Sequence, residues 1–349
     1  MFNHPLLTEQ LEKLRIENRI AGMSVAVTDG DKVIYNQGFG FENAIRPEVK
    51  TYPDALYKIA SMTKTVTAVM ILCLCQEGIL DLDKPIKTYL SWLTLSRPGA
   101  ADTITLRDLL MHTAGMPGDT FLEEGSRDEN TMDEQIMLQL PTFEISALPE
   151  ERKFCYSSWG YNLIGCVASA ATGRPYTELM REYVLKPLGM DTSTFDYQVA
   201  STYPLSLPHR CNADGSFRVL HQQRINTAYH AGAGLYSNTT DMCKFARFLL
   251  RGGVSDDGKR ILSEKFVADM LSKHNEFVGK HGVYYGLGAF VCPYADRYIY
   301  GHTGNYDPYN SSIFVDKKTN CGVVFLANSH VMELRYEISG IIFSMMEQK

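Results

Sequence analysis

The chain has 349 residues, of which 45% are hydrophobic, 11% aromatic and 21% charged. This is the composition of an ordinary globular protein, and it excludes a disordered, collagenous or coiled-coil chain. Lysine and arginine number 34 against 40 aspartate and glutamate residues, which gives a formal net charge of −6. Because phosphate binding requires a basic face, nucleic acid is not an expected partner.

No segment is expected to cross a membrane. The longest apolar run, Val66 to Cys75, is about half as long as the ~20 residues that a spanning helix needs. The N-terminus lacks a basic region followed by a long apolar stretch, and residues 6–14 are typical of an amphipathic helix. The 8 cysteines include no C-x-x-C pair and several lie in apolar stretches, which favours free buried thiols. We therefore expect a cytoplasmic protein with no membrane partner.

After the first helix, the sequence predicts a β-hairpin and a buried helix. Strands over 23–28 and 32–36 flank Asp29-Gly30-Asp31, a turn that favours a hairpin. Residues 61–77 are apolar on nearly every side, and Gly78 follows them. A helix with this pattern is expected to be surrounded by the core.

The middle third of the chain, from about 80 to 195, is predicted to be mostly helical. The stretch Thr105 to Asp108 is a capping box, and helical patterns cover 161–172 and 176–185. The acid-rich segment 119–134 is expected to be a solvated surface loop without a role in the site.

From roughly residue 215 the pattern returns to strands, and a final helix is predicted over 331–347. Short links between the strands favour antiparallel pairing. The predicted strands cover 287–291, 298–300, 312–315 and 323–326.

These elements predict an α+β fold, in which an antiparallel sheet is covered by helices and interrupted by a mostly α-helical insertion domain. Residues 1–62 and 215–349 are expected to form the sheet domain, and residues 63–214 the helical domain. The active site is expected in the cleft between them.

Ser61 and Lys64 lie three residues apart at the start of the predicted buried helix, so that the hydroxyl can meet the amine. Serine is a poor nucleophile until a base takes its proton. Lysine can be that base if burial and the positive helix N-terminus disfavour its charged form. The alternative is that Ser61 is a helix N-cap and Lys64 a surface residue whose amine reaches water.

Two further motifs follow in order: Tyr156-Ser157-Ser158 before the helix 161–172, and His302-Thr303-Gly304 at the end of the strand 298–300. Together with Ser61 and Lys64, they resemble the S-x-x-K, Y-x-N and K-T-G signature of the serine β-lactamase and penicillin-recognising enzyme superfamily. The tyrosine in the second motif is similar to the class C branch, with its esterases, D-aminopeptidases and DD-carboxypeptidases. The resemblance covers about residues 15–330 and includes the stretches Thr105 to Gly115, Lys186 to Met190 and Gly234 to Ser237.

The resemblance implies a role for each matching residue. Ser61 would be the acylated nucleophile, Lys64 its hydrogen-bonded partner and Tyr156 the general base. Because an unperturbed tyrosine has a pKa of about 10, Lys64 would have to stabilise the phenolate or share the proton, and which of the two is the base stays open. The oxyanion hole would consist of the backbone N–H groups of Ser61 and Asn305. The residues that would contact the substrate are Ser158, His302, Thr303 and Gly304.

Some residues depart from the family pattern or compete with it. Ser158 stands where the family usually has Asn, and His302 where β-lactamases have Lys, a stronger partner for a substrate carboxylate. Tyr236-Ser237-Asn238 matches the second motif more literally than Tyr156 does, but it is typical of a helix cap. His112 is expected to be a hydrogen-bonded structural histidine and not a base.

The sequence thus predicts a serine hydrolase that acts through an acyl-enzyme on small esters or amides. The expected type is an esterase or a D-amino-acid peptidase with weak or incidental hydrolysis of β-lactams. The alternatives are a genuine class C-like β-lactamase, or a non-catalytic protein that binds penicillin or a peptidoglycan fragment. No cofactor or metal is expected, because no His, Cys or Asp cluster has metal-site spacing and no Gly-rich phosphate loop follows a strand.

Overall fold

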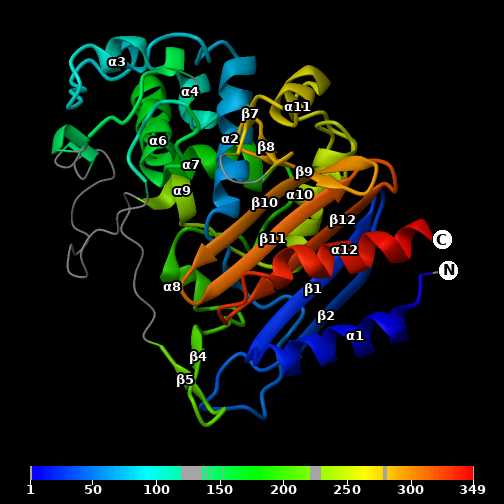
Figure 1. Ribbon diagram of the computed structural model, residues 1–349. Coiled ribbons are helices and arrows are strands. Elements are labelled where there is room, and N and C mark those ends of the chain that lie inside the picture. Colours follow the sequence, from blue (N-terminus) through cyan, green and yellow to red (C-terminus); the bar gives the residue numbers. More distant parts are fainter. Residues whose placement is uncertain are drawn as a thin grey trace.

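The computed structural model describes residues 2–118, 136–137, 140–142, 144–151, 153–220, 229–277 and 281–348. Within them, an antiparallel sheet has the strand order β2-β1-β12-β11-β10-β9-β8-β7. Most of the helices lie together beside one end of this sheet (Figure 1). The strands are β1 (Gly22–Asp29), β2 (Val33–Gly40), β7 (Asn275–Glu276), β8 (Tyr284–Tyr285), β9 (Phe290–Tyr294), β10 (Arg297–Tyr306), β11 (Tyr309–Asp316) and β12 (Cys321–Ala327).

The sheet joins the two ends of the chain. The predicted hairpin is confirmed, since β1 pairs with β2, and the other edge of β1 pairs with β12 from Met23 opposite Ala327 to Asp29 opposite Cys321. Residues about 290 to 305 positions apart in the sequence therefore lie in neighbouring strands, and the predicted α+β class is confirmed.

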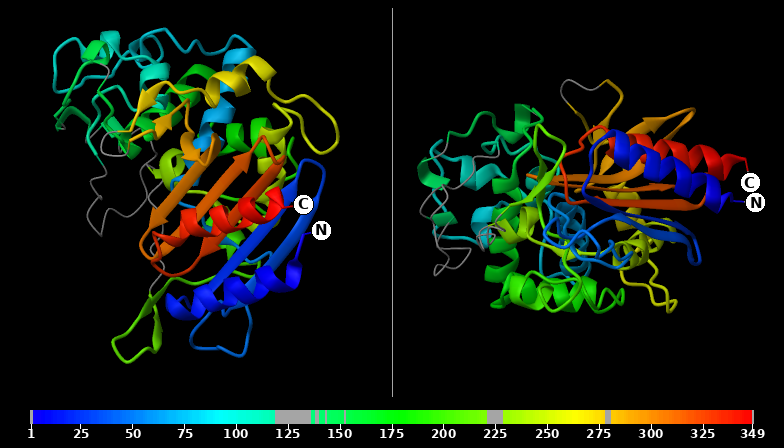
Figure 2. Two further views of the ribbon diagram at one scale, coloured as in Figure 1. Left: turned by 45° about the vertical axis from the view of Figure 1, so that its right-hand side comes forward. Right: turned by 90° about the horizontal axis from the view of Figure 1, so that it is seen from below.

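Helices cover both faces of the sheet. Helices α1 (His4–Glu17) and α12 (Leu334–Glu347) lie side by side on one face (Figure 2). Helix α10 (Thr239–Leu250) packs against β1, β11 and β12 on the opposite face. Because side chains alternate along a strand, each face of β12 buries its own apolar set, and the strand is buried from end to end.

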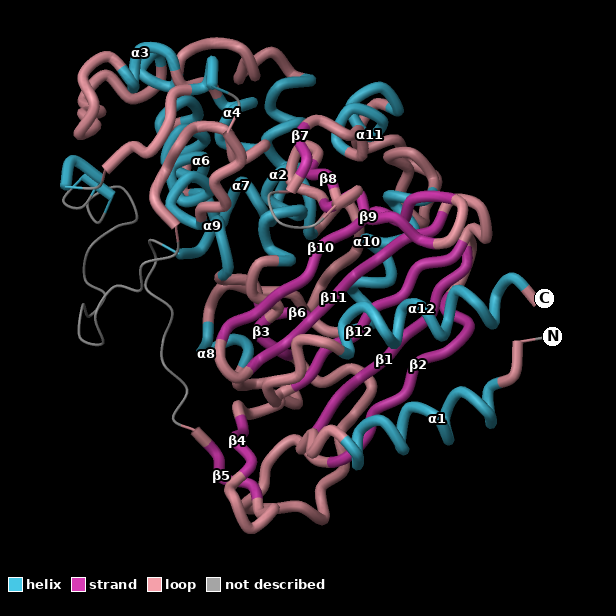
Figure 3. The backbone as a smooth tube through the Cα atoms, in the orientation of Figure 1, coloured by secondary structure: helices cyan, strands magenta, loops and turns pink. Residues whose placement is uncertain are grey.

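Helix α2 (Met62–Gln76) is the centre of the helical part of the molecule. Its residues Met62 to Leu74 are all buried, as the predicted helix requires. The helix ends before Gly78, which has a φ of 73° and makes the left-handed turn that follows. Figure 3 shows α2 between the other helices and the end of the sheet where β10 lies.

Several predicted elements have different bounds in the structure. Helix α6 (Ser158–Thr172) begins three residues early, because the Ser157 hydroxyl caps it by accepting the N–H of Gly160. The helix predicted over 176–185 is divided into α7 (Tyr176–Met180) and the π-helix η4 (Arg181–Leu185).

The predicted C-terminal strands shift as well. Strand β9 begins later than predicted, since Gly288 has a φ of 83° and packs against Ala68 of α2. Strand β10 runs on to Tyr306, so that the His302-Thr303-Gly304 motif lies inside the strand and not at its end.

The remaining elements are short. The predicted capping box is present at α4, where Thr105 and Asp108 satisfy each other's backbone N–H groups. The predicted acidic loop 119–134 lies outside the described residues, and the domain bounds at 62 and 214 stay a prediction. No helix among the described ranges is long and apolar enough to cross a membrane. The short elements are β3 (Tyr57–Lys58), η1 (Ile86–Thr88), α3 (Ala100–Thr103), α4 (Leu106–Leu110), η2 (Leu140–Thr142), η3 (Pro149–Glu151), α8 (Tyr197–Ala200), β4 (His209–Cys211), β5 (Phe217–Val219), α9 (His230–Ala233), β6 (Tyr236–Ser237) and α11 (Glu264–Met270).

Candidate active site

A sharp turn places Ser61 at the N-terminus of α2. Strand β3 pairs with β6, and the N–H of Ile59 donates to the carbonyl of Leu235 at 3.0 Å. The next residue, Ala60, has a φ of 50°, a conformation that residues other than glycine rarely adopt. The chain thereby turns from strand into helix, and Ser61 is left partly exposed while Lys64 is fully buried.

The Lys64 amine is held by three acceptors. Its Nζ donates to Ser61 Oγ at 3.0 Å, to Ser158 Oγ at 2.9 Å and to the carbonyl of Gly232 at 3.0 Å. An ammonium group has three donors, and each of these contacts can use one of them. The structure thus brings the predicted Ser61–Lys64 pair together and adds acceptors from α6 and α9.

Ser158 occupies a position close to the amine in spite of its short side chain. It is the first residue of α6, and its hydroxyl accepts from Lys64. One turn further along α6, Asn162 accepts the N–H of Gly232 at 3.2 Å. Asn162 and Gly232 were not predicted to take part, although the spacing of four residues from Ser158 could have indicated Asn162.

Tyr156 lies next to the lysine. The Lys64 Nζ is 4.9 Å from the centroid of the Tyr156 ring, a distance at which a cation and a ring attract each other. The same ring is 4.3 Å from that of His112 and 6.4 Å from that of His302. The three residues predicted to be catalytic, Ser61, Lys64 and Tyr156, therefore form one cluster.

His302 is a neutral buried side chain. Its exposed fraction is 1%, and its ring packs 4.6 Å from that of Phe290. Burial and the neighbouring charge of Lys64 lower its pKa to about 3. Because Nδ1 donates to the carbonyl of Thr303 at 2.6 Å, Nε2 accepts the hydroxyl of Tyr285 at 2.9 Å. The predicted contact with substrate stays a prediction, and the contact that the structure gives His302 is with Tyr285, which no sequence signal indicated.

Gly304 allows β10 to approach the backbone that precedes Ser61. A Cβ at this position would lie 2.3 Å from the carbonyl oxygen of Ile59 and 2.2 Å from Ser311 Oγ. No other residue fits without moving one of these groups. Its neighbour Thr303 is buried, with a side-chain hydrogen bond to Tyr336.

The register of β10 orients the peptide group of Asn305. Tyr306 and Tyr309 face each other across a two-residue turn, and Asn305 faces Asn310. Since peptide groups alternate along a strand, the N–H of Asn305 is expected to point away from β11. On that side, the pairing of β10 with β9 ends at Gly301. This orientation suits the predicted oxyanion role of Asn305, which stays a prediction.

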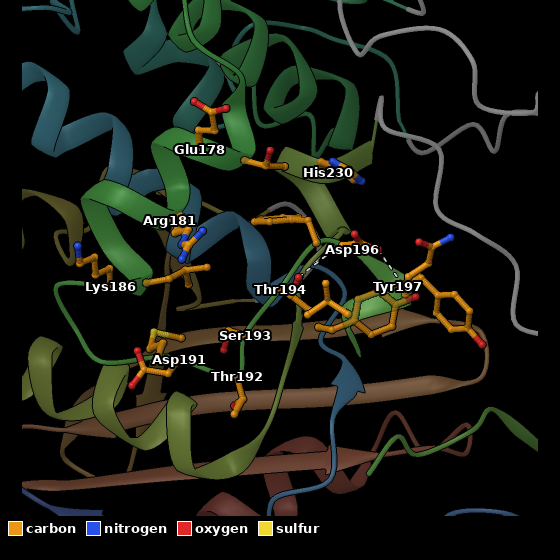
Figure 4. A pocket seen from close by; sticks show the side chains of 17 residues that line it. Glu178, Arg181, Lys186, Asp191, Thr192, Ser193, Thr194, Asp196, Tyr197 and His230 are labelled. Atoms are coloured by element: carbon orange, nitrogen blue, oxygen red, sulfur yellow. Dashed lines mark hydrogen bonds between the residues drawn. The ribbon is translucent and has the colours of Figure 1, made fainter. Parts of the chain in front are cut away.

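The competing second motif is a helix cap, as the sequence predicted. Tyr236 lies in β6 with 2% of its surface exposed, and Asn238 Oδ1 accepts the N–H of Asp241 at the start of α10. A cavity of about 920 Å³ lies beside this strand (Figure 4). None of the predicted site residues lines this cavity; His230 of α9 does, two residues before the Gly232 carbonyl that holds Lys64.

Known proteins resemble this chain over most of its length. The family described as Beta-lactamase matches residues 7–338. Protein flp of Staphylococcus aureus (strain MW2) is 28% identical over 314 residues, which are 89% of this chain and 60% of the relative. Penicillin-binding protein 4 of Amycolatopsis lactamdurans is 26% identical over 283 residues, 77% of this chain and 70% of the relative. The chain thus spans about 60% of the length of flp.

Solved structures share the fold. An octameric penicillin-binding protein homologue from Pyrococcus abyssi has a TM-score of 0.84 and 24% identity, covering 99% of this chain and 77% of its own. A D-amino acid amidase from Ochrobactrum anthropi SV3, complexed with L-phenylalanine amide, has a TM-score of 0.82 and 22% identity, covering 98% and 99%. With the match of the family over nearly the whole sequence, the resemblance seen in the motifs is confirmed: the chain belongs to the β-lactamase family.

Proposed function

We propose that the chain is a serine hydrolase that forms an acyl-enzyme at Ser61 and acts on small esters or amides. The observation that carries the proposal is the hydrogen bond of 3.0 Å between Lys64 Nζ and Ser61 Oγ at the N-terminus of a buried helix. A hydroxyl so placed has a base within reach and a partly open surface for the substrate.

The reaction follows from the cluster. Ser61 Oγ attacks the carbonyl carbon, and its proton passes to the Tyr156–Lys64 pair. The N–H groups of Ser61 and Asn305 stabilise the negative oxygen of the tetrahedral intermediate. When the bond to the leaving alcohol or amine breaks, the pair returns the proton to that group. Water then attacks the acyl-enzyme by the same route in reverse, which releases the acid and frees Ser61.

The third motif favours substrates without a required carboxylate. β-Lactams carry a carboxylate, and a lysine in this motif would offer it a fixed positive charge. His302 is instead neutral, buried and bonded to Tyr285. We therefore place neutral esters and amino acid amides above β-lactams as substrates, and the D-amino acid amidase among the structural neighbours supports the amide class.

The test is covalent labelling followed by a panel of substrates. Intact-mass analysis after reaction with a fluorophosphonate should show one adduct, mapped to the Ser61 peptide and absent from Ser61→Ala. Hydrolysis of p-nitrophenyl esters and of D- and L-phenylalanine amide should exceed that of nitrocefin in kcat/KM. Absence of the adduct would overturn the proposal. An adduct without turnover of any member of the panel would favour the binding-protein alternative, and a strong preference for nitrocefin would favour the β-lactamase.

A further inference from the structure

The turn after α4 brings His112 against both neighbours of Tyr156. The carbonyl of His112 accepts the N–H of Cys155 at 2.7 Å, and its Nδ1 accepts the N–H of Ser157 at 3.1 Å. One residue therefore accepts the backbone N–H groups of both sequence neighbours of Tyr156. The imidazole also packs against the Tyr156 ring, with the centroids 4.3 Å apart and the planes 39° from each other.

The backbone of His112 is specialised for this arrangement. Its φ is 60°, in the left-handed region that residues other than glycine adopt only uncommonly. The turn is fixed on the helix side by the N–H of Thr113, which donates to the carbonyl of Asp108 at 2.8 Å. A strained conformation of this kind persists only where the surrounding contacts hold it.

The imidazole is neutral. Because Nδ1 accepts an N–H, the ring proton is on Nε2, which has no hydrogen-bond partner among the residues that the structure describes. Burial and the positive charge of Lys64 hold the pKa of His112 well below its ordinary value. A neutral ring with its lone pair occupied has no free site for the proton of Ser61, and His112 is therefore not the base.

The groups that face the imidazole come from four other elements or segments. They are Lys64 of α2, Tyr156 just before α6, Tyr161 within α6, Tyr285 of β8 and His302 of β10. Tyr161 is itself fixed, since its hydroxyl donates to the carbonyl of Leu110 at 2.9 Å. The ring of Tyr156 thus rests on one side against the buried, neutral imidazole of His112, which is itself packed against Tyr161 and Tyr285.

We infer that His112 is a positioning residue: by accepting the N–H of Ser157 and packing under the phenol ring, it fixes Tyr156 against Lys64. The inference rests on the proposed function, because positioning matters here only if Tyr156 exchanges a proton with Ser61. Loss of the Nδ1 acceptor leaves the Ser157 N–H unpaired in a buried site and allows the Tyr156 segment to move. Proton transfer depends steeply on the distance between donor and acceptor, so the effect should appear in kcat.

Three variants separate the contribution of the Nδ1 acceptor from that of the ring of His112. His112→Gly tolerates the positive φ and removes both ring and acceptor. His112→Asn also tolerates the φ, and its Oδ1 can take the place of Nδ1. His112→Phe keeps a ring but offers no acceptor, and it replaces the glycine variant in the test if that variant does not fold. The hydrolysis of a p-nitrophenyl ester is measured from pH 5 to 10. Each kcat is calculated from the concentration of active sites, which is titrated with a fluorophosphonate, so that unfolded protein does not lower the value.

The glycine variant is expected to lose about 10²-fold in kcat, with KM changed less than threefold and the apparent pKa of the kcat/KM profile displaced. The asparagine variant should recover most of the loss. In a Tyr156→Phe background, His112→Gly should cause little further loss, because the two changes remove one function. A purely structural role would lower the unfolding temperature and the titrated fraction but leave kcat per site and its pH profile unchanged.

The result that overturns the inference is a glycine or phenylalanine variant with wild-type kcat and pH profile per titrated site, or an asparagine variant as impaired as glycine. Independent, multiplicative losses in the double variant would overturn it as well. Failure of the wild-type protein to label at Ser61 would instead overturn the proposed function. The two failures are therefore distinguishable.

Discussion

At the scale of single residues, the site is defined by how Lys64 is buried. Its amine has no exposed surface and is satisfied by two hydroxyls and a carbonyl. A lysine is expensive to place in such a site unless it is paired or hydrogen-bonded, so the surrounding acceptors offset part of that cost. The same acceptors fix the direction from which the amine meets Ser61 Oγ.

Replacing Lys64 should lower the reactivity of the Ser61 hydroxyl far more than it weakens the binding of substrate. Lys64→Met keeps the length and apolar stem but removes the amine that donates to Ser158 Oγ and to the Gly232 carbonyl. We expect the rate constant for labelling of Ser61 by a fluorophosphonate to fall at least ~10²-fold, because the base assembly is lost. This rate constant is measured by quenching the labelling reaction at successive times and determining the labelled fraction by mass spectrometry. Lys13→Met is the control, since the Lys13 side chain is 71% exposed. An unchanged rate would show that Ser61 does not depend on the amine.

The general base is tested by a matched pair of tyrosines. Tyr156→Phe should lower kcat by ~10² to 10⁴, the range of a general acid–base group, whereas Tyr236→Phe should lower it little. Each change removes one hydroxyl and keeps the ring. Steady-state kinetics on one ester compare the two, and the reverse order would transfer the second motif to Tyr236.

At the scale of elements, the proposed catalysis depends on how closely β10 lies against the turn before α2. Three segments meet there: the end of β3, the first residue of α2 and the glycine of the third motif. The Ser311 hydroxyl of β11 donates to the carbonyl of Ile59 at 2.8 Å, which ties the turn to the sheet. The distance between the nucleophile and the expected oxyanion donor on β10 is set by this junction.

A single methyl group should disturb the junction. Gly304→Ala places a Cβ 2.3 Å from the Ile59 carbonyl oxygen, and one of the two backbones has to move. We expect the free energy of unfolding to fall by ~1–3 kcal/mol, as for overpacked sites, and kcat to fall by at least ~10-fold. Denaturant unfolding and ester hydrolysis measure the two. Gly118→Ala is the control, since a Cβ there meets no atom of the described residues within 4 Å, and equal effects of both variants would refute the argument.

Local sequence patterns predicted the parts of this junction but not their assembly. The spacing of Ser61 and Lys64 on one helix face follows from helix geometry, and the structure has that contact. The start of α6 was missed, because Ser157 was interpreted as part of a motif although it is also a good N-cap. The Gly232 carbonyl and Tyr285 hydroxyl gave no signal, since backbone groups and isolated tyrosines acquire such roles only through contacts distant in sequence.

At the scale of the whole molecule, several histidines are folded into the interior in their neutral form. Burial lowers the pKa of His209 and of His230 to about 4, and that of His302 to about 3. In the unfolded chain, a histidine has a pKa of about 6.5. Below that pH the unfolded chain binds protons that the folded chain does not, so acid favours unfolding.

Stability should therefore decline as the pH falls from about 6.5 towards 4. Each buried histidine contributes a slope of up to ~1.4 kcal/mol per pH unit in that window, and none above it. His209→Gln should remove the contribution of one histidine to this slope, because glutamine does not titrate. Glutamine can also accept the Ala44 N–H that His209 Nε2 accepts at 2.8 Å. Urea unfolding at pH 4.5, 5.5 and 7 measures the slope. A slope unaffected by His209→Gln would contradict the prediction.

The pairing of β1 with β12 also has a consequence for synthesis of the protein. Ser61 leaves the ribosome about 240 residues before Asn305, and β1 cannot join this side of the sheet until β11 and β12 have also been made. At a translation rate of ~5–20 residues per second, the interval is roughly 12–50 s. During this time Ser61 lacks both the expected oxyanion donor on β10 and the completed sheet that positions that strand. A nascent chain is therefore expected to lack the reactivity proposed for Ser61 until β12 has been made.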